Sequence, residues 1–244
     1  MYGVIARYAG GERGAKAAAR SGSVVVVVDA FRASTTIAVL VSKGARVVPV
    51  ASIEHAYSYP GADFRIGERG SDKVAGFDFG NSPTEVLEAE VPPDSTVSLS
   101  STNGTRVVEA AGGAPAILTG AFVNAGALAE ALAMELAAGA HGAEEVVVVG
   151  CGWKGRRASE DEAAAGAILD RLRVRGVELD RRARRVVEGY FSRPAATLRN
   201  NSAARRLKRL GYERDLEFSL AEDTVPVVPR LAGGAFVGDT SAPR

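Results

Sequence analysis

Short apolar runs, rich in β-branched residues and without regular polar alternation, recur along the chain. Such runs are typical of strands that are buried on both faces of a sheet, because neither face has to contact water. They predict strands at 23–28, 45–50, 64–66, 96–99, 116–118 and 145–149, and a late strand at 225–228.

Stretches with helical composition and spacing lie between these runs. We predict helices at 33–43, 54–59, 105–111, 124–138 and 160–174. Ser159 is expected to cap the last of these helices, because Glu162 stands three residues later in the capping-box position. Gly176 is expected to end it.

The order of strand and helix, repeated, is typical of a parallel sheet covered by helices on both faces. We therefore predict a three-layer α/β/α fold with a mostly parallel or mixed sheet, and an arrangement in two similar halves is compatible with this order. The Arg-rich stretch 181–209 is expected to be helical with a break near Ser192–Pro194. With 244 residues, the chain 1–244 is expected to form a single compact domain.

Charge and composition exclude several classes of protein. Thirty Lys and Arg residues against 29 Asp and Glu give a net charge of +1, so no nucleic-acid partner is expected, and we interpret the arginines at 181–185 as a solvated helix face. Apolar runs such as Val24–Val28 are far shorter than the roughly 20 residues of a membrane span. The single cysteine, Cys151, and the absence of a signal-peptide pattern predict a cytoplasmic protein.

Polar residues follow the first long apolar run directly. Asp29 and Arg32 come first, and the hydroxyls of Ser34, Thr35 and Thr36 follow at the predicted start of a helix. Hydroxyls, backbone N–H groups and an Arg at a helix N-terminus can bind a phosphate. A simpler interpretation is that Asp29 or Ser34 only caps the helix.

Two later turns have the same character. In open α/β sheets, ligands bind beyond the carboxyl ends of strands, so these positions are candidates for a shared site. The candidate residues of these turns are Glu68, Arg69, Asp78, Asn81, Ser82, Thr102, Asn103, Gly104 and Thr105. Asn81–Pro83 can equally be the cap and first turn of a helix.

The carboxylates among these phosphate-binding groups point to a metal ion. Asp29, Glu68 and Asp78 would repel a bare anion, whereas Mg²⁺ would bridge them to a phosphate. This predicts Mg²⁺-dependent hydrolysis of a phosphate monoester, with a carboxylate orienting or deprotonating the attacking water.

At these clusters the chain resembles the 2-phosphosulfolactate phosphatase family, Mg²⁺-dependent enzymes that form sulfolactate in coenzyme M biosynthesis. The motifs that carry the resemblance, in chain order, are 29–36, 67–70, 76–83, 101–105, 120–124, 159–161 and 211–229. The resemblance implies catalytic roles for Asp29, Arg32, Glu68 and Asp78. It implies metal binding by Asp29, Glu68 and Asp78, with Glu160 and Asp161 as second-rank ligands.

The resemblance also implies a set of contacts to a small phosphorylated acid. These substrate contacts are Ser34, Thr35, Thr36, Arg69, Asn81, Ser82, Thr102, Asn103, Gly104, Thr105 and Asn124. Arg69 or Arg106 is expected to meet the carboxylate or sulfonate of the substrate. The stretch 150–158 is more basic than the family pattern leads us to expect, which affects which acid is accepted. A homodimer is compatible with the pattern.

Three alternatives remain open at this point. Cys151 and Arg157 have the spacing of a Cys-x5-Arg phosphatase loop, which would make Cys151 a nucleophile that acts without metal. Asp29 faintly resembles the aspartate nucleophile of haloacid-dehalogenase phosphatases, although Phe31 stands where a second Asp is needed. The protein could also bind phosphorylated acids as a sensor, without turnover.

Overall fold

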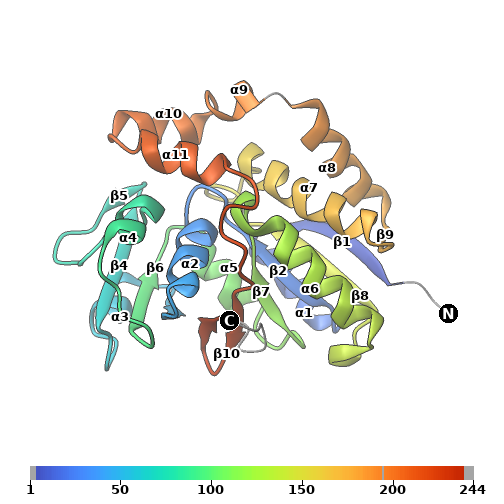
Figure 1. Cartoon of the computed structure of the whole chain (residues 1–244), viewed down its shortest axis with the longest axis horizontal. Coiled ribbons are helices and arrows are strands. Elements are labelled where there is room, and N and C mark those ends of the chain that lie inside the picture. Colours follow the sequence, from blue (N-terminus) through green and yellow to red (C-terminus); the bar gives the residue numbers. More distant parts are fainter. Residues whose placement is uncertain (1–3, 194, 239–244) are drawn as a thin grey trace.

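One mixed sheet runs through the structure, a computed structural model that describes residues 4–193 and 195–238 (Figure 1). The larger parallel block contains, in spatial order, β7 (Ile117–Thr119), β2 (Val24–Val28), β8 (Glu145–Gly150), β1 (Ile5–Gly10) and β9 (Glu178–Leu179). The smaller parallel block contains β3 (Arg46–Pro49), β6 (Thr96–Ser100) and β4 (Phe64–Arg69), with the short antiparallel β5 (Asp72–Lys73) at its edge.

A C-terminal hairpin joins the two blocks. Its strands, β10 (Arg230–Ala232) and β11 (Ala235–Val237), are antiparallel to each other and to the strands on either side. Arg230 pairs with Leu118 of β7, and Phe236 pairs with Val47 of β3. The last described strands of the chain therefore make the sheet continuous at its centre.

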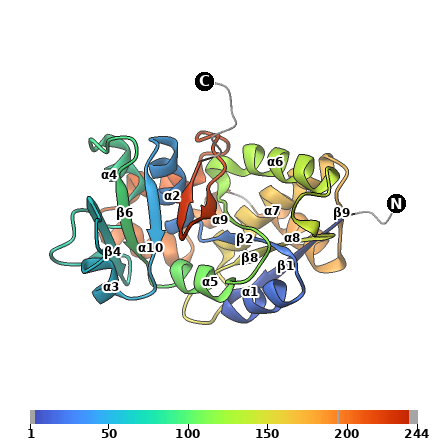
Figure 2. The same cartoon turned by 90° about the horizontal axis from the view of Figure 1, so that it is seen from below.

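Helices cover both faces of the sheet. Figure 2 shows α1 (Gly11–Arg20), α3 (Ile53–Tyr57) and α5 (Gly104–Ala110) on one face, and α2 (Ala33–Ser42), α4 (Pro83–Glu88) and α6 (Ala125–Ala137) on the other. The helix α7 (Ser159–Val174) packs between α6 and α8 (Arg181–Ser192). The short helices α9 (Ala195–Leu198), α10 (Ser202–Arg209) and α11 (Glu213–Leu220) lie along the top of Figure 1, where α11 packs against α4 and the 3₁₀ turn η1 (Phe122–Asn124). A second 3₁₀ turn, η2 (Ala140–Gly142), follows α6.

The five valines of β2 show why helices cover both faces of the sheet. All five are at most 1% exposed. Successive side chains of a strand point to opposite faces, so Val24, Val26 and Val28 pack in one core cluster while Val25 and Val27 pack in the other. A strand without any polar position can only lie where helices cover both faces.

The three-layer prediction is confirmed, and the strands and helices predicted between residues 23 and 174 are present at the predicted places. The late strand at 225–228 was wrong. Pro226 and Pro229 have no N–H to donate to a ladder, and the segment is a loop in which Val225 N donates to Val123 O at 2.8 Å. The strand pairing resumes only at Arg230.

The predicted cap of α7 was also wrong. The N-cap position is Ala158, which has no side-chain acceptor, and Ser159 is the first helical residue. The Ser159 hydroxyl instead accepts a hydrogen bond from Asn201 Nδ2 at 3.0 Å. The end of α8 at Ser192 matches the predicted break, whose Pro194 lies outside the described residues.

Several elements had no counterpart in the sequence prediction, namely β1, α1, α11 and the hairpin β10–β11. None of the helices within residues 4–193 and 195–238 combines the length and the apolar character that crossing a membrane requires.

The hairpin supplies a large side chain to the core, which predicts a stability effect. Phe236 is 0% exposed, so Phe236→Ala should lower the free energy of unfolding by about 3–5 kcal/mol through the cavity it leaves. Urea denaturation followed by circular dichroism measures this change. Phe191→Ala, at a position that is 65% exposed, is the control and should change stability by no more than about 0.5 kcal/mol. Equal effects of the two variants would contradict the central place of the hairpin.

Candidate active site

A polar cavity lies where the carboxyl ends of the two parallel blocks approach each other beneath α10. It collects residues from turns that are far apart in the sequence. The lining residues are Asp29, Phe31, Arg32, Glu68, Ser71, Asn81, Asn103, Gly152, Trp153, Glu160, Asp161 and Arg206. Four of them are carboxylates, which is an unusual concentration for one small enclosed space.

Asp29 stands directly after β2, half-buried with its side chain toward the cavity. Its carboxylate accepts hydrogen bonds from the backbone N–H groups of Ala33, at 3.4 Å, and of Gly104. A Cβ atom on Gly104 would lie 2.9 Å from Asp29 Oδ2, closer than non-bonded atoms normally approach. Glycine at position 104 therefore allows the start of α5 to hold the Asp29 carboxylate across the two blocks.

Glu68 stands near the end of β4 and is buried. Its Oε1 accepts from Thr102 N at 2.5 Å, and its Oε2 accepts from Ser71 N at 2.7 Å. The carboxylate thus fixes the turn after β6 and the turn after β4 at the same time. It is held in place by backbone groups, so its position does not depend on a flexible side-chain partner.

The first turn of α7 contributes Glu160 and Asp161, both buried. Asp161 Oδ1 accepts from Ala30 N at 2.9 Å and Asp161 Oδ2 from Gly152 N at 2.7 Å. Acidic residues in a first turn are favoured by the helix dipole alone, but these bonds also tie α7 to the turns after β2 and β8.

Burial and mutual repulsion shift the titration of these acids. Enclosure by protein, followed by the charges of Glu68 and Glu160, raises the pKa of Asp29 to about 7. Burial, with Asp29 and Glu160 nearby, raises the pKa of Asp161 well above its usual range, and burial raises the pKa of Glu160. The cavity is therefore short of positive charge.

Oxygen donors with unrelieved negative charge fit a hard divalent cation. In the part of the chain that the structure describes, no three acidic, histidine or cysteine side chains already surround a common point as in a finished metal site. Mg²⁺ does not need such a cage, because it commonly takes one or two carboxylates and completes its shell with waters and substrate phosphate oxygens. The donor set of Asp29 and Glu68, with Asp161 and Glu160 beside them, meets that requirement.

Two arginines face the carboxylates. Arg32 is buried and donates to Asp215 Oδ2 and to Ser71 O, both at 2.6 Å, while its guanidinium lies 4.2 Å from the centre of the Tyr212 ring. Asp215 Oδ1 accepts from Ser82 Oγ at 2.7 Å. Arg32 is therefore locked by a buried ion pair that belongs to α11.

Arg206 of α10 is the second arginine at the cavity. Its Nε donates to Ser71 Oγ at 2.8 Å, and its guanidinium stacks 3.8 Å from the centre of the Trp153 ring. Burial lowers the pKa of Arg206, while the charges of Glu160 and Glu68 oppose that shift. Unlike Arg32, Arg206 has no carboxylate oxygen within 4.0 Å of its guanidinium nitrogens among the described residues. Its charge is therefore available to a ligand.

Asn81 is the clearest sign of a missing ligand. It is 3% exposed and lines the cavity, yet its Oδ1 has no hydrogen-bond partner among the described residues. A buried amide oxygen without a partner costs free energy unless a ligand or water satisfies it. Asn103, on the opposite turn, accepts from Lys154 N at 3.3 Å and also lines the cavity.

Comparison with known proteins adds to this geometry. A model of the 2-phosphosulpholactate phosphatase family matches residues 12–234, a span that includes every residue lining the cavity. The chain belongs to this family. Among its relatives, proteins named probable 2-phosphosulfolactate phosphatase occur in Thermotoga petrophila (35% identical, covering 87% of this chain and 90% of the relative) and Gloeobacter violaceus (36%, 87% and 90%). One from a Synechococcus strain is 37% identical, over 84% of this chain and 87% of the relative.

Seven of the site residues predicted from the sequence lie together at this cavity. They are Asp29, Arg32, Glu68, Asn81, Asn103, Glu160 and Asp161. Gly104 and Thr102 lie just outside the cavity. The Gly104 N–H donates to the Asp29 carboxylate, and the Thr102 N–H donates to the Glu68 carboxylate. Sequence reasoning missed Ser71, Arg206 and Asp215, although Asp215 lies in the C-terminal motif that carries the family resemblance.

Asp78 does not join the predicted metal ligands. Its side chain is exposed, and Oδ2 accepts from Arg65 N at 2.7 Å near the start of β4, away from the carboxyl end that presents Glu68. Arg69 is exposed as well, outside the cavity lining, and donates to Ser100 Oγ at 3.1 Å. The trio Asp29, Glu68 and Asp78 is thus not assembled in the structure.

Several predicted phosphate contacts serve the fold instead. Thr35 donates to Ala30 O, Thr105 donates to Ser101 O, and the Ser34 hydroxyl accepts from Asp29 N. Ser82 caps α4 through Glu85 N, and the buried Asn124 amide links Ala121 N to Val227 O. Thr36 is fully buried and does not line the cavity. These side chains shape the turns without facing the cavity.

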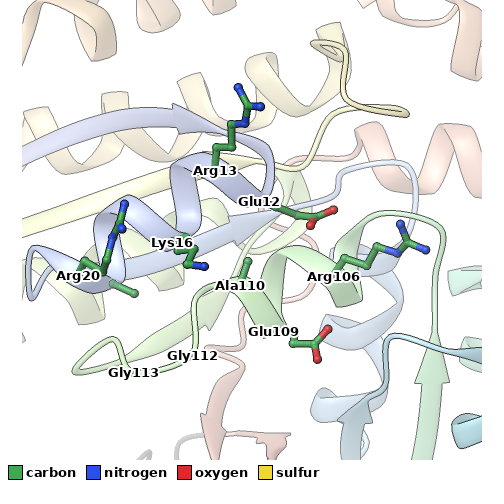
Figure 3. Close-up of a pocket in the computed structure, with 10 residues that line it drawn as sticks. Glu12, Arg13, Lys16, Arg20, Arg106, Glu109, Ala110, Gly112 and Gly113 are labelled. Atoms are coloured by element: carbon green, nitrogen blue, oxygen red, sulfur yellow. The ribbon is translucent and has the colours of Figure 1, made fainter.

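Arg106 lies in a different and larger hollow of about 710 Å³. Figure 3 shows it there, with Arg13, Lys16 and Arg20 of α1 across from Glu109 of α5. This groove contains none of the cavity carboxylates. Its size alone does not make it the site of the family chemistry.

The Cys-x5-Arg loop is not formed. Burial, with Asp29 and Asp161 nearby, raises the pKa of the Cys151 thiol well above its usual value, so the thiol stays protonated. The Arg157 side chain is 77% exposed, and its guanidinium pairs with the Glu162 carboxylate. The geometry disfavours a cysteine nucleophile.

The contact between Gly104 and Asp29 predicts a specific defect. Gly104→Ala should displace the Asp29 carboxylate and reduce turnover by about 10- to 100-fold, because small misplacements at a reacting centre are costly. Gly189→Ala in α8, where an added Cβ meets no atom within 4 Å, is the matched control. It should leave kcat unchanged and stability equal or slightly higher. Wild-type turnover by Gly104→Ala would show that this contact does not matter.

Proposed function

We propose that this protein is a Mg²⁺-dependent phosphatase of a small phosphorylated hydroxy acid, with 2-phosphosulfolactate as substrate and sulfolactate and phosphate as products. The observation that carries the proposal is the cavity itself, in which four carboxylates lie beside Arg206 and the Asn81 amide oxygen. Among the described residues, Arg206 has no ion-pair partner and the Asn81 oxygen has no hydrogen-bond donor. Relatives named for this reaction cover most of the chain, which supports the choice of substrate.

Asp29 and Glu68 would hold the metal ion, because they come from opposite walls and each is fixed by backbone N–H groups. The bound ion would neutralise charge on the phosphoryl group. Asp161 and Glu160, on the wall formed by α7, can accept a hydrogen bond from the attacking water. Water supplies an oxygen to phosphorus, the ester P–O bond breaks, and the leaving oxygen ends as the hydroxyl of the product.

The remaining lining groups bind and orient the substrate. Arg206 offers a guanidinium to a phosphate, carboxylate or sulfonate group, and its stacking on Trp153 limits its movement. The Asn81 amide gains a partner when a ligand fills the cavity. Arg32, held by Asp215, is a positioning residue that braces the turn containing Ser71.

A sensor without turnover fits these observations less well. A site that only binds an anion is weakened by every carboxylate placed in it, because like charges repel. The cavity has four. A cytoplasmic location and a role in coenzyme M biosynthesis are parts of the proposal, and they depend on the single cysteine and on the family resemblance.

Replacing Asp29 tests the central carboxylate. Asp29→Asn should reduce kcat by at least about 100-fold with a modest change in stability, because the amide keeps the shape and removes the charge that would bind a metal ion. Asp78→Asn, a matched change at the exposed position beside Arg65, should retain near-normal activity. Phosphate release with saturating substrate measures both, and the reverse pattern would exclude the proposed site.

Chelation and cysteine replacement separate the metal mechanism from the thiol mechanism. We expect a screen of phosphorylated hydroxy acids to show phosphate release from 2-phosphosulfolactate with Mg²⁺, loss of that activity in excess EDTA, and recovery when Mg²⁺ is returned. Cys151→Ser should stay within about twofold of wild type, because the thiol is buried and protonated. Activity that survives EDTA but not Cys151→Ser would refute the proposal, and tight binding without release would indicate a sensor.

A further inference from the structure

A second hollow, of about 170 Å³, lies at the carboxyl ends of β1 and β8. The chain leaves these adjacent strands in opposite directions: β1 leads into α1 on one face of the sheet and β8 leads into α7 on the other. In open α/β sheets, ligands bind in the crevice that forms where neighbouring connections diverge in this way. The position of the hollow is therefore that of a ligand site.

The N-terminus of α1 opens into this crevice. Gly10 and Gly11 line it, and no side chain caps the helix at Gly10. Gly11 has φ +61°, a left-handed conformation that glycine adopts without strain, which turns the chain sharply from strand into helix. The first N–H groups of the ten-residue helix and its positive dipole end favour an anion here.

Tyr8 gives an independent indication of a ligand. The residue is 7% exposed and lines the crevice, and its hydroxyl lies so close to Gly150 that a Cβ there would be 2.5 Å away. This hydroxyl makes no hydrogen bond of 3.5 Å or less to any other residue in the described part of the chain. A phenol on β1 that lines the crevice and has no hydrogen-bond partner among the described residues is available to donate to a bound anion.

The charged side chains that line the crevice are arginines, although the nearby carboxylates of Glu162 and Asp161 also act on Tyr8. Arg156, Arg157 and Arg182 line the crevice, and the guanidinium of Arg182 lies 5.2 Å from the centre of the Tyr8 ring. Arg157 is paired with Glu162, whereas Arg156 and Arg182 form no ion pair within 4.0 Å among residues 4–193 and 195–238. Arg182 belongs to the arginine run that we interpreted as a solvated face, so that interpretation is incomplete.

We propose that the β1–β8 crevice binds a tetrahedral oxyanion, phosphate or the similarly shaped sulfonate, at a site distinct from the carboxylate-lined cavity. The loop after β8 separates the two: Gly152 borders both hollows, and its N–H points to Asp161 on the cavity side. A neighbouring hollow of about 350 Å³ shares Tyr8, Arg157 and Arg182 and adds further arginines of α8. A larger phosphorylated ligand can extend into it.

Calorimetric titration of the full chain with inorganic phosphate and with pyrophosphate, in EDTA, tests this inference. Without a divalent cation the carboxylate cavity repels anions, so the remaining binding reports on the crevice. We expect measurable binding of phosphate that weakens at least about tenfold in Arg182→Ala and about threefold to tenfold in Tyr8→Phe. Pyrophosphate binding more tightly than phosphate would identify a polyphosphate ligand, and equal affinities would identify a single oxyanion.

Arg20→Ala, which removes the same charge from the far end of α1, is the control and should bind like wild type. Melting temperatures of all variants establish that the fold is intact. Absence of binding to wild type, or equal weakening by Arg182→Ala and Arg20→Ala, overturns the assignment. Because the titration needs neither metal nor turnover, its failure is independent of failure of the proposed phosphatase activity.

Discussion

The structure depends on keeping several carboxylates together in one enclosed space. Asp29, Glu68 and Asp161 would repel one another, and their burial away from water adds to the free energy cost. Backbone N–H groups offset this cost, and each carboxylate accepts from a segment other than its own: Asp29 from Gly104, Glu68 from Thr102 and Asp161 from Gly152. The bond from Gly104 to Asp29 therefore also joins the two blocks of the sheet, while the bonds to Glu68 and Asp161 fix neighbouring turns within one block.

The C-terminal part of the chain completes both the cavity at the strand ends and the sheet itself. α10 brings Arg206 to the cavity, α11 brings Asp215 to the cavity residue Arg32, and the hairpin β10–β11 then fills the centre of the sheet. The ion pair between Arg32 and Asp215 is buried on both sides, so removing either partner would leave an uncompensated charge. The effect of this ion pair is to fix the position of α11 against the turn after β2.

Local patterns were enough to predict the strands between residues 23 and 150, the layers, and polar residues at or near strand ends, such as Asp29, Glu68 and Asn103. They failed where placement depends on the path of the chain. Asp78 is close to Glu68 in sequence, but the chain turns back through β5 so that Phe79 pairs beside Ile66, earlier in β4. The helices that carry Arg206 and Asp215 have ordinary amphipathic sequences. Only tertiary packing brings Arg206 to the cavity and Asp215 to its lining residue Arg32. The strand β1 escaped notice because it carries Arg7 and leads into a glycine-rich helix.

The same edge of the sheet carries two hollows of opposite charge. The turn after β2, the end of β4 and the first turn of α7 supply carboxylates, which favour a cation there. Around β1 and β8 the turns supply glycine N–H groups and arginines, which favour an anion without any metal. The loop that begins at Gly152 lies between the two hollows: its Arg156 and Arg157 line the crevice, while the Gly152 N–H donates to Asp161. The proposed anion site would account for Arg156 and Arg157 in the basic stretch 150–158, which then need not contact a ligand of the carboxylate-lined cavity.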